Sequence, residues 1–330
     1  MRKVPLGRSG ISVSRLGFGC MGLAEFYGEA LSNAEAEKIL DAALDRGINF
    51  FDTADMYGVG RNEEQLSGVL KRRRKDVVIA TKFAVQRGAD GAWLGVTNDP
   101  KYIKNACDAS LKRLGVDQID LYYMHRRDRS VPIEDSVGAM AALVKAGKVK
   151  ALGLSEVSAD TLKKANAIHP IAALQSEYSI MTRDMEVEMI PLCRKLGVAF
   201  VAYSPLSRGL LTGAYRLNED FGEGDYRRQR SPRFAGEALD KNNALVDKLR
   251  EIAKKKDATL AQIALAWVLS KGDDIIPIPG TKKFGRLDEN VGAVDVALSA
   301  EDVAAIEKAV PPSAVSGARY PEQASSSLNG

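Results

Sequence analysis

The most constraining feature of the sequence is a regular alternation of short apolar segments with amphipathic helical segments. The apolar segments are rich in β-branched and aromatic residues, as strands buried on both faces of a parallel sheet must be. The eight candidate strands are Arg15–Gly19, Ile48–Thr53, Val77–Lys82, Ile119–His125, Val149–Ser155, Ala172–Tyr178, Ala199–Ser204 and Ile275–Pro279. Eight strand–helix units in 330 residues predict an α/β protein built as a (β/α)8 TIM barrel, with a doubly wound open sheet as the alternative.

Helix-start signals support this alternation. Ser32 and Glu35 have the spacing of a capping box, as do Thr259 and Gln262, and Pro100 suits the first position of another helix. No change in composition marks a domain boundary, so we expect one barrel domain over residues 1–330.

Three segments lie outside the alternation. Val4–Val13 is predicted to be a hairpin that turns at Arg8-Ser9-Gly10. Leu206–Gly236 is long, charged and without an apolar period, and Pro311–Gly330 is a polar tail. Long loops in a compact domain are usually lids or disordered segments.

Composition argues against several classes of protein. The net charge of +4 is too small to indicate nucleic-acid binding, and we interpret the basic run Lys71–Lys75 as the solvated end of a helix. No apolar leader and no run of about 18 apolar residues occurs, so we expect a cytoplasmic protein without a membrane partner. Three scattered cysteines and two histidines favour neither a disulfide framework nor a metal site.

A glycine motif needs a separate interpretation. Gly17, Gly19 and Gly22 match the dinucleotide-binding pattern G-x-G-x-x-G after a candidate strand. That mechanism requires a helix directly behind the glycines to hold the pyrophosphate, and the next predicted helix starts near Ser32. We therefore interpret the motif as a glycine-rich loop at the end of the first barrel strand.

Polar groups stand at the ends of the candidate strands. They are Asp52, Lys82, His125, Ser155 with Glu156, Gln175 with Glu177, Tyr203 with Ser204, and the run Gly280-Thr281-Lys282-Lys283. In a parallel barrel these ends share one rim, which is where barrel enzymes carry their active sites.

Tyr57 follows the second candidate strand by a few residues and suggests a chemistry for this rim. A phenol with a pKa near 10 is a poor acid at neutral pH unless a cation lowers that pKa. Lys82 would supply the cation, Asp52 would hold Lys82 by a salt bridge, and His125 would donate to a carbonyl oxygen. Taken singly, each residue has an ordinary structural interpretation; the combination favours catalysis.

The chain resembles the aldo-keto reductases over nearly its whole length. The matching motifs are Asp52-Thr53-Ala54-x-x-Tyr57-Gly58, Lys82, His125, Gly147-Lys148-Val149-x-x-Leu152-Gly153-Leu154-Ser155, Tyr203-Ser204-Pro205-Leu206, Gly209-Leu210-Leu211-Thr212-Gly213, and Ile278-Pro279-Gly280-Thr281 with Arg286 and Glu289-Asn290. The resemblance implies a (β/α)8 barrel that binds NADP(H) without a Rossmann motif and reduces a small-molecule carbonyl substrate. The family's catalytic tetrad falls on Asp52, Tyr57, Lys82 and His125.

The resemblance also implies a cofactor site. Ser155 and Gln175 match groups that bind the nicotinamide carboxamide, Tyr203 matches the ring that stacks on the nicotinamide, and Lys282 and Arg286 match the cations that hold the 2′-phosphate. The remaining matches are Ser204, Leu206, Gly209, Gly280 and Thr281, and, for the adenine, Glu289 and Asn290.

The sequence departs from the family pattern at one position and leaves one alternative open. Glu156 stands where the family commonly has Asn, so it can accept but not donate a hydrogen bond. Ion-channel β-subunits share the fold, the tetrad and the bound NADP, so a regulatory subunit is the alternative to an enzyme. In this family the substrate is set by mobile loops, which the resemblance places at Phe83–Pro100, at Leu206–Gly236 and in the carboxyl-terminal tail. Phe26, Tyr27 and Trp93 are candidate walls of the substrate pocket, with ordinary packing as the alternative.

Overall fold

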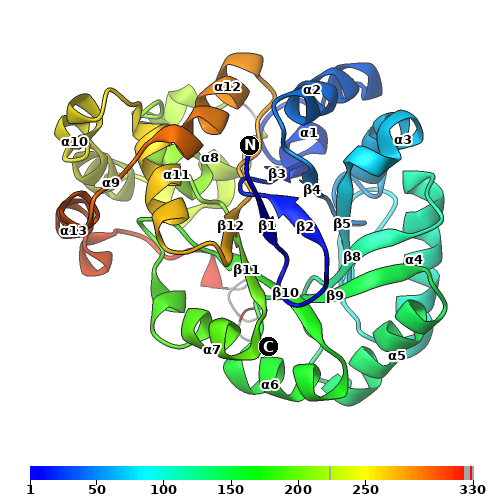
Figure 1. Ribbon diagram of the computed structural model, residues 1–330. Helices are drawn as coiled ribbons and strands as arrows, with labels where there is room; N and C mark the ends of the chain where they lie inside the picture. The colour runs from blue at the N-terminus through cyan, green and yellow to red at the C-terminus, as the bar shows by residue number, and fades with distance from the viewer. Residues whose placement is uncertain (223, 323–327, 329–330) are drawn as a thin grey trace.

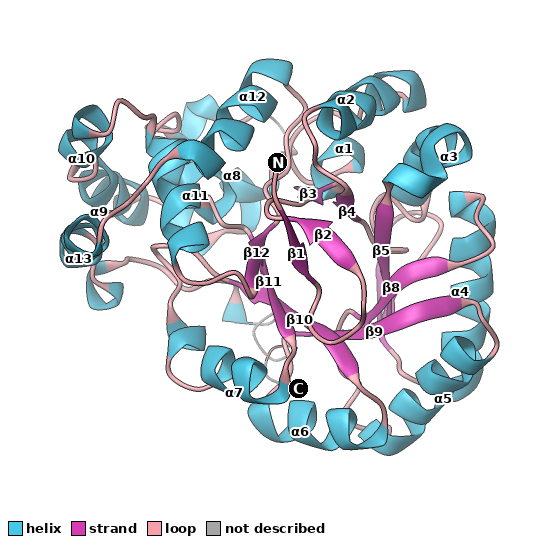
Figure 2. Ribbon diagram, in the orientation of Figure 1, coloured by secondary structure: helices cyan, strands magenta, loops and turns pink. Residues whose placement is uncertain are grey.

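The eight principal strands form one parallel sheet in the computed structural model, which describes residues 1–222, 224–322 and 328 (Figure 1). In spatial order they are β12 (Ile275–Pro277), β11 (Ala199–Tyr203), β10 (Ile171–Glu177), β9 (Val149–Ser155), β8 (Ile119–Met124), β5 (Val78–Phe83), β4 (Phe50–Asp52) and β3 (Phe18–Gly19). All eight strands, from β3 to β12, therefore follow chain order around a curled sheet, with helices on the outside (Figure 2).

Backbone hydrogen bonds join the two ends of this sheet. The Gly17 amide donates to the Pro277 carbonyl at 2.9 Å, and the Gly19 amide donates to the Pro279 carbonyl at 3.2 Å. Because β3 and β12 are the end strands, these bonds close the ring and confirm the predicted barrel.

The glycine motif is explained by this closure. A Cβ on Gly280 would lie 2.2 Å from the Gly19 carbonyl oxygen, and a Cβ on Gly19 would lie 2.8 Å from the Ile278 carbonyl oxygen, so this close approach requires glycine at both positions. One prediction was wrong: a short helix, α1 (Met21–Ala24), begins directly behind the glycines rather than near Ser32. It spans four residues, and the barrel, not a Rossmann unit, surrounds it.

The amino-terminal end of the barrel is filled by the predicted hairpin. Strands β1 (Lys3–Pro5) and β2 (Ser12–Ser14) pair antiparallel, with Val4 opposite Val13, as the sequence indicated. Val4 and Val13 belong to the same buried cluster as Phe50, Leu121 and Tyr123 of the barrel interior. This cluster therefore fills the amino-terminal part of the barrel interior, while a larger cluster includes the apolar faces of the outer helices. The carboxyl ends of the strands are left to form a site.

The helices pack outside the sheet, and the three helix starts predicted at Ser32, Pro100 and Thr259 are confirmed. They are α2 (Asn33–Asp45), α3 (Arg61–Arg73), α4 (Pro100–Leu114), α5 (Ile133–Lys145), α6 (Ala159–Ile168), α7 (Met189–Leu196), α9 (Glu237–Asp247), α10 (Arg250–Lys255), α11 (Leu260–Ser270), α12 (Phe284–Gly292) and α13 (Ala300–Ala309). Both predicted capping boxes are present, at Ser32 with Glu35 and at Thr259 with Gln262.

Two segments predicted as loops have more structure than their sequences indicate. Phe83–Pro100 contains a hairpin of β6 (Val85–Arg87) and β7 (Trp93–Val96). The segment Leu206–Gly236 shows no apolar periodicity in its sequence, but its aromatic rings pack into a small core. Phe221 stacks on Tyr215 at 4.8 Å and meets Phe234 edge-on at 5.4 Å, and the short helix α8 (Tyr226–Arg230) packs beside them.

The polar tail was predicted over Pro311–Gly330, and residues 323–327 and 329–330 lie outside the described residues. Within residues 1–222, 224–322 and 328, no helix is long and apolar enough to cross a membrane. That one domain spans residues 1–330 stays a prediction.

Candidate active site

A cavity of about 1460 Å³ lies at the carboxyl ends of the strands. It is lined by every residue that the sequence singled out for catalysis or cofactor binding, except Lys82. Lys82 lies directly behind the wall, with its side chain fully buried. The cavity is larger than an ordinary small-ligand pocket of about 300–1000 Å³, as a dinucleotide together with a substrate would require.

A buried ion pair occupies the inner end of this cavity. Asp52 and Lys82 stand on the neighbouring strands β4 and β5, and Lys82 Nζ donates to Asp52 Oδ1. Lys82 Nζ also donates to the Thr53 carbonyl at 2.8 Å, and Gln175 Nε2 donates to Asp52 Oδ2 at 2.7 Å. Burial raises the pKa of Asp52 and lowers the pKa of Lys82, and the attraction between the two charges opposes both shifts.

Tyr57 lies beside this pair, but its pKa moves opposite to the sequence-based expectation. Lys82 Nζ is 5.2 Å from the centroid of the Tyr57 ring. Burial raises the pKa of the phenol well above its usual value, Asp52 adds to the rise, and the Arg126 cation opposes it. The prediction that Lys82 brings the pKa of Tyr57 down is therefore wrong for this structure. The phenol stays protonated, which is the form that can donate a proton.

His125 completes the inner end. Its ring meets the Tyr57 ring edge-on, with 5.7 Å between centroids. Burial lowers the pKa of His125 well below its usual value, and the cations of Arg126 and Lys82 lower it further, so the imidazole is neutral. Among the described residues, its buried Nδ1 has no hydrogen-bond partner.

The outer end of the cavity is cationic. Lys282, Lys283 and Arg286 line it, together with Glu289 and the buried Asn290 of α12. Lys282 Nζ donates to the carbonyls of Tyr27 and Glu29, at 2.6 and 2.7 Å. Glycines 19, 22 and 280 also line the cavity and let a ligand approach the backbone closely. Cations at one end and the tetrad at the other fit a phosphate-bearing dinucleotide.

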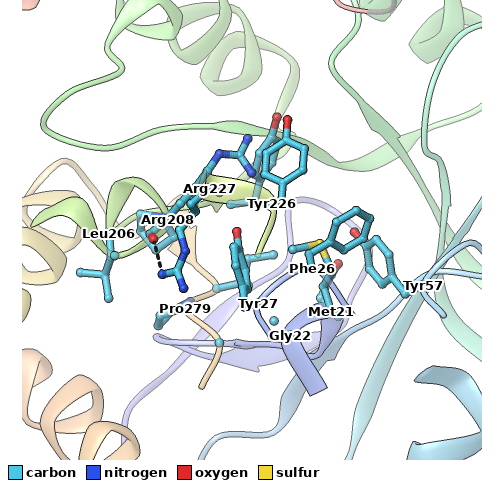
Figure 3. A pocket seen from close by; sticks show the side chains of 18 of the residues that line it. Met21, Gly22, Phe26, Tyr27, Tyr57, Leu206, Arg208, Tyr226, Arg227 and Pro279 are labelled. Carbon is cyan, nitrogen blue, oxygen red and sulfur yellow. Dashed lines mark hydrogen bonds between the residues drawn. The ribbon is translucent and has the colours of Figure 1, made fainter. Parts of the chain in front are cut away.

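Segments far apart in the sequence meet over this cavity. The Tyr226 amide donates to the Phe26 carbonyl at 3.0 Å, and their rings meet edge-on at 6.0 Å. The Arg227 guanidinium lies 4.8 Å from the Tyr27 ring centroid. Figure 3 shows Phe26 near Tyr57, and Arg227 on the other side of Tyr27. Phe26 and Tyr27, like Trp93, line the cavity as expected.

Comparison with known proteins identifies the family. The model of the aldo/keto reductase family matches residues 15–311. The chain is 47% identical over 322 residues to a probable aldo-keto reductase 1 of Glycine max, covering 97% of this chain and 92% of the relative.

The chain belongs to the aldo/keto reductase family. It is also 45% identical over 322 residues to an aldo-keto reductase of Schizosaccharomyces pombe named yakc [NADP(+)], covering 96% of this chain and 94% of that one. Family membership supports oxidoreduction of carbonyl compounds.

Solved structures of aldo-keto reductases share the fold. The glycerol dehydrogenase AKR11B4 from Gluconobacter oxydans superposes with a TM-score of 0.85 at 26% identity, covering 94% of this chain and 96% of that one. The holo form of aldo-keto reductase AKR11C1 from Bacillus halodurans gives a TM-score of 0.78 at 31% identity, covering 94% and 97%.

The unusual Glu156 of this aldo-keto reductase faces the carboxyl-terminal segment. Its Oε1 accepts from Tyr203 Oη at 2.7 Å, from Arg319 Nη2 at 2.5 Å and from the Glu177 amide at 2.9 Å. The hydroxyl of Tyr320 lies 2.9 Å from that of Tyr203. The departure from the family pattern thus coincides with an anchor for residues 319 and 320.

Sequence reasoning missed Arg126, Arg208 and Tyr320 as cavity residues. Arg126 could have been found, because it directly follows His125 at the end of a strand, where the other candidates were sought. Arg208 has a backbone in the left-handed region, at φ 56°, and its guanidinium lies 4.9 Å from the Tyr320 ring centroid. Nothing in the polar tail pointed to Tyr320. The described residues contain no cluster of three or more His, Cys, Asp or Glu suited to a metal ion.

The lowered pKa of His125 predicts a pH dependence of stability. Below pH about 6.5 the unfolded chain binds a proton at this position, whereas the folded protein keeps the imidazole neutral. Stability is therefore complete above that pH and falls as the pH drops, by up to about 1.4 kcal/mol per pH unit from this group. Urea unfolding between pH about 5 and 7 should show a shallower pH slope for His125→Asn than for the wild type.

The second histidine supplies the control. His169→Asn removes a histidine whose ring, among the described residues, hydrogen-bonds only to the Pro170 carbonyl. Identical slopes for the wild type and His125→Asn would show that the His125 imidazole is not held neutral by the fold.

Proposed function

We propose that the protein is an NADPH-dependent reductase that converts an aldehyde or ketone to the alcohol. The observation that carries the proposal is one cavity that holds Tyr57, His125 and the Asp52–Lys82 pair at its inner end and cations at its outer end. When bound, the cofactor supplies a hydride to the carbonyl carbon.

Tyr57 is the proposed proton donor to the carbonyl oxygen. Its phenol is protonated over the whole neutral range because burial raises its pKa. The neutral His125 imidazole donates a hydrogen bond that orients the carbonyl. Lys82, 5.2 Å from the Tyr57 ring, stabilises the negative charge that forms on the phenol as its proton leaves. Asp52 holds Lys82 in place and is not the acid.

Positioning of the cofactor is assigned to residues along the cavity wall. Tyr203 would present its ring to the nicotinamide, with its hydroxyl fixed by Glu156. Ser155 and Gln175 would bind the carboxamide. Gln175 already donates to Asp52, so its remaining amide groups link the cofactor site to the ion pair.

The preference for NADP(H) rests on the outer cations. Lys282 now donates to two backbone carbonyls, which are neutral acceptors, and a phosphate would compete well for it. Burial would raise the pKa of Tyr215, but the cations of Arg227 and Arg286 lower it overall, which reflects the positive field at this end. The name of the Schizosaccharomyces pombe relative, which includes NADP(+), agrees with this preference.

Replacement of Tyr57 tests the function. Tyr57→Phe removes the proton donor and keeps the ring, so we expect kcat for aldehyde reduction to fall by about 100-fold or more while NADPH binding is retained. Turnover is followed by NADPH absorbance and binding by fluorescence titration. Tyr122→Phe is the matched control, because Tyr122 is fully buried, its hydroxyl has no partner among the described residues, and it lies outside the cavity.

Full activity of Tyr57→Phe would overturn the assignment of the acid. Binding of NADPH without turnover of any aldehyde, ketone or quinone by the wild type would instead favour a regulatory subunit of the ion-channel type.

Replacement of Arg286 tests the phosphate site. Arg286→Ala should weaken NADPH binding by about 10- to 100-fold, the effect of losing a charged hydrogen bond, and change NADH binding far less. Dissociation constants of both cofactors, measured by fluorescence titration, decide this. Equal losses for NADPH and NADH would refute the 2′-phosphate role.

A further inference from the structure

Arg126 is a cation at the inner end of the cavity that the proposed chemistry does not use. It follows His125 at the end of β8, is half-buried and lines the cavity. Its Nη1 donates to the His125 carbonyl at 2.7 Å and to Ser155 Oγ at 3.3 Å. These contacts fix the guanidinium but leave its charge without a counter-ion.

Four other cations near the cavity are paired with carboxylates. Lys82 pairs with Asp52, Arg87 with Glu25 at 3.3 Å, and Arg319 with Glu156 at 2.5 Å. Arg208 pairs with Glu177 at 3.4 Å. Within the part of the chain that the structure describes, Arg126 makes no ion pair with a carboxylate, unlike these four cations.

The charge of Arg126 acts directly on the reacting groups. Arg126, Tyr57 and His125 line the same cavity, and the positive charge of Arg126 lowers the pKa of both other residues. Its Nε and Nη2 make no hydrogen bond to the described residues. A half-buried guanidinium has lost part of its hydration, and its planar donors match carboxylate and phosphate oxygens.

We propose that Arg126 binds an anionic oxygen group, a carboxylate or a phosphate, carried by the carbonyl substrate. It is a specificity-determining residue, and the substrate class is an aldehyde or ketone with a negatively charged group near the carbonyl. This inference rests on the proposed function, because it places the group relative to Tyr57 and His125. The competing explanation is structural: Arg126 would only hold the His125 carbonyl and the Ser155 hydroxyl in place.

Matched substrates separate these explanations. The probes are succinic semialdehyde against butanal for a carboxylate, and glyceraldehyde 3-phosphate against glyceraldehyde for a phosphate. We expect the wild type to have the higher kcat/KM for at least one anionic member. Arg126→Gln should lower the anionic-to-neutral ratio of kcat/KM by about tenfold or more, as expected for loss of a charged hydrogen bond, and Arg126→Lys should restore part of it.

Arg87→Gln is the control variant. Arg87 also lines the cavity and is part-buried, but its charge is paired with Glu25. It should leave the anionic-to-neutral ratio at the wild-type value. The arm that responds to Arg126→Gln identifies the anion as a carboxylate or a phosphate. A loss of kcat/KM by the same factor for charged and neutral probes, or no change in either ratio, would overturn the proposal.

A binding measurement keeps the inference testable if turnover fails. If the wild type reduces none of the four probes, calorimetry with 4-hydroxybutyrate still tests the anion site. The proposed function itself fails only if no aldehyde, ketone or quinone is turned over. Weaker binding by Arg126→Gln than by the control Arg87→Gln, which removes a paired cation of the same cavity, supports the site. Equal binding by the two variants overturns it.

Discussion

The buried ion pair of Asp52 and Lys82 is the interaction on which the site depends. Both side chains are almost inaccessible to solvent, at 3% and 0% exposure. Removing two charges from water costs several kcal/mol per ion, so the pair persists only because each charge has further partners. The Thr53 carbonyl accepts from Lys82, and Gln175 donates to Asp52. The barrel makes this possible, because β4, β5 and β10 bring all these groups to one rim.

In the mechanism proposed above, the pair has a chemical use rather than a stabilising one. An apolar pair of similar volume would satisfy the interior at least as well. With the pair present, however, a cation sits 5.2 Å from a phenol that burial keeps protonated. The cation does little for the resting phenol. It matters when the proton leaves and a negative charge must be held in a poorly solvated pocket.

A second network of buried charges fixes the opposite wall. Burial would raise the pKa of Glu177, but Arg208, Arg319 and Arg233 outweigh it and lower the pKa overall. With Glu156, this carboxylate holds the carboxyl-terminal segment against Tyr203. The carboxylates of this wall are thus occupied by other arginines, and Arg126 is left without one.

Much of the fold could be predicted from signals between residues close in sequence. The features that were not predicted depend on contacts between residues far apart in sequence or on irregular turns. Capping boxes at Ser32 and Thr259 mark helix starts because they involve residues three positions apart. The tail contact between Arg319 and Glu156 joins residues 163 positions apart, and no local pattern encodes it. The aromatic core around Phe221 lacks a period because its rings meet across irregular turns.

The site shows the same division. Strand ends located the candidates for the tetrad and the cofactor site because a parallel barrel gathers them on one rim. All of them line one cavity except Lys82, which lies behind its wall. The sequence predicted a lowered pKa for Tyr57 because a sequence shows which charges are available, but it does not show how deeply a side chain is buried. The pKa of a fully enclosed phenol is set first by desolvation.

A double-mutant cycle on Asp52 and Lys82 tests whether the ion pair is retained for its chemistry. The free energy of unfolding and the rate of aldehyde reduction are measured for each variant. Asp52→Asn and Lys82→Met should each destabilise by about 3–5 kcal/mol, because each leaves an unpaired buried charge. The double variant should cost at least about 2 kcal/mol less than the sum of the two, yet remain as inactive as Lys82→Met. Additive stabilities, or a double variant that reduces aldehydes at the wild-type rate, would contradict a pair retained for its chemistry.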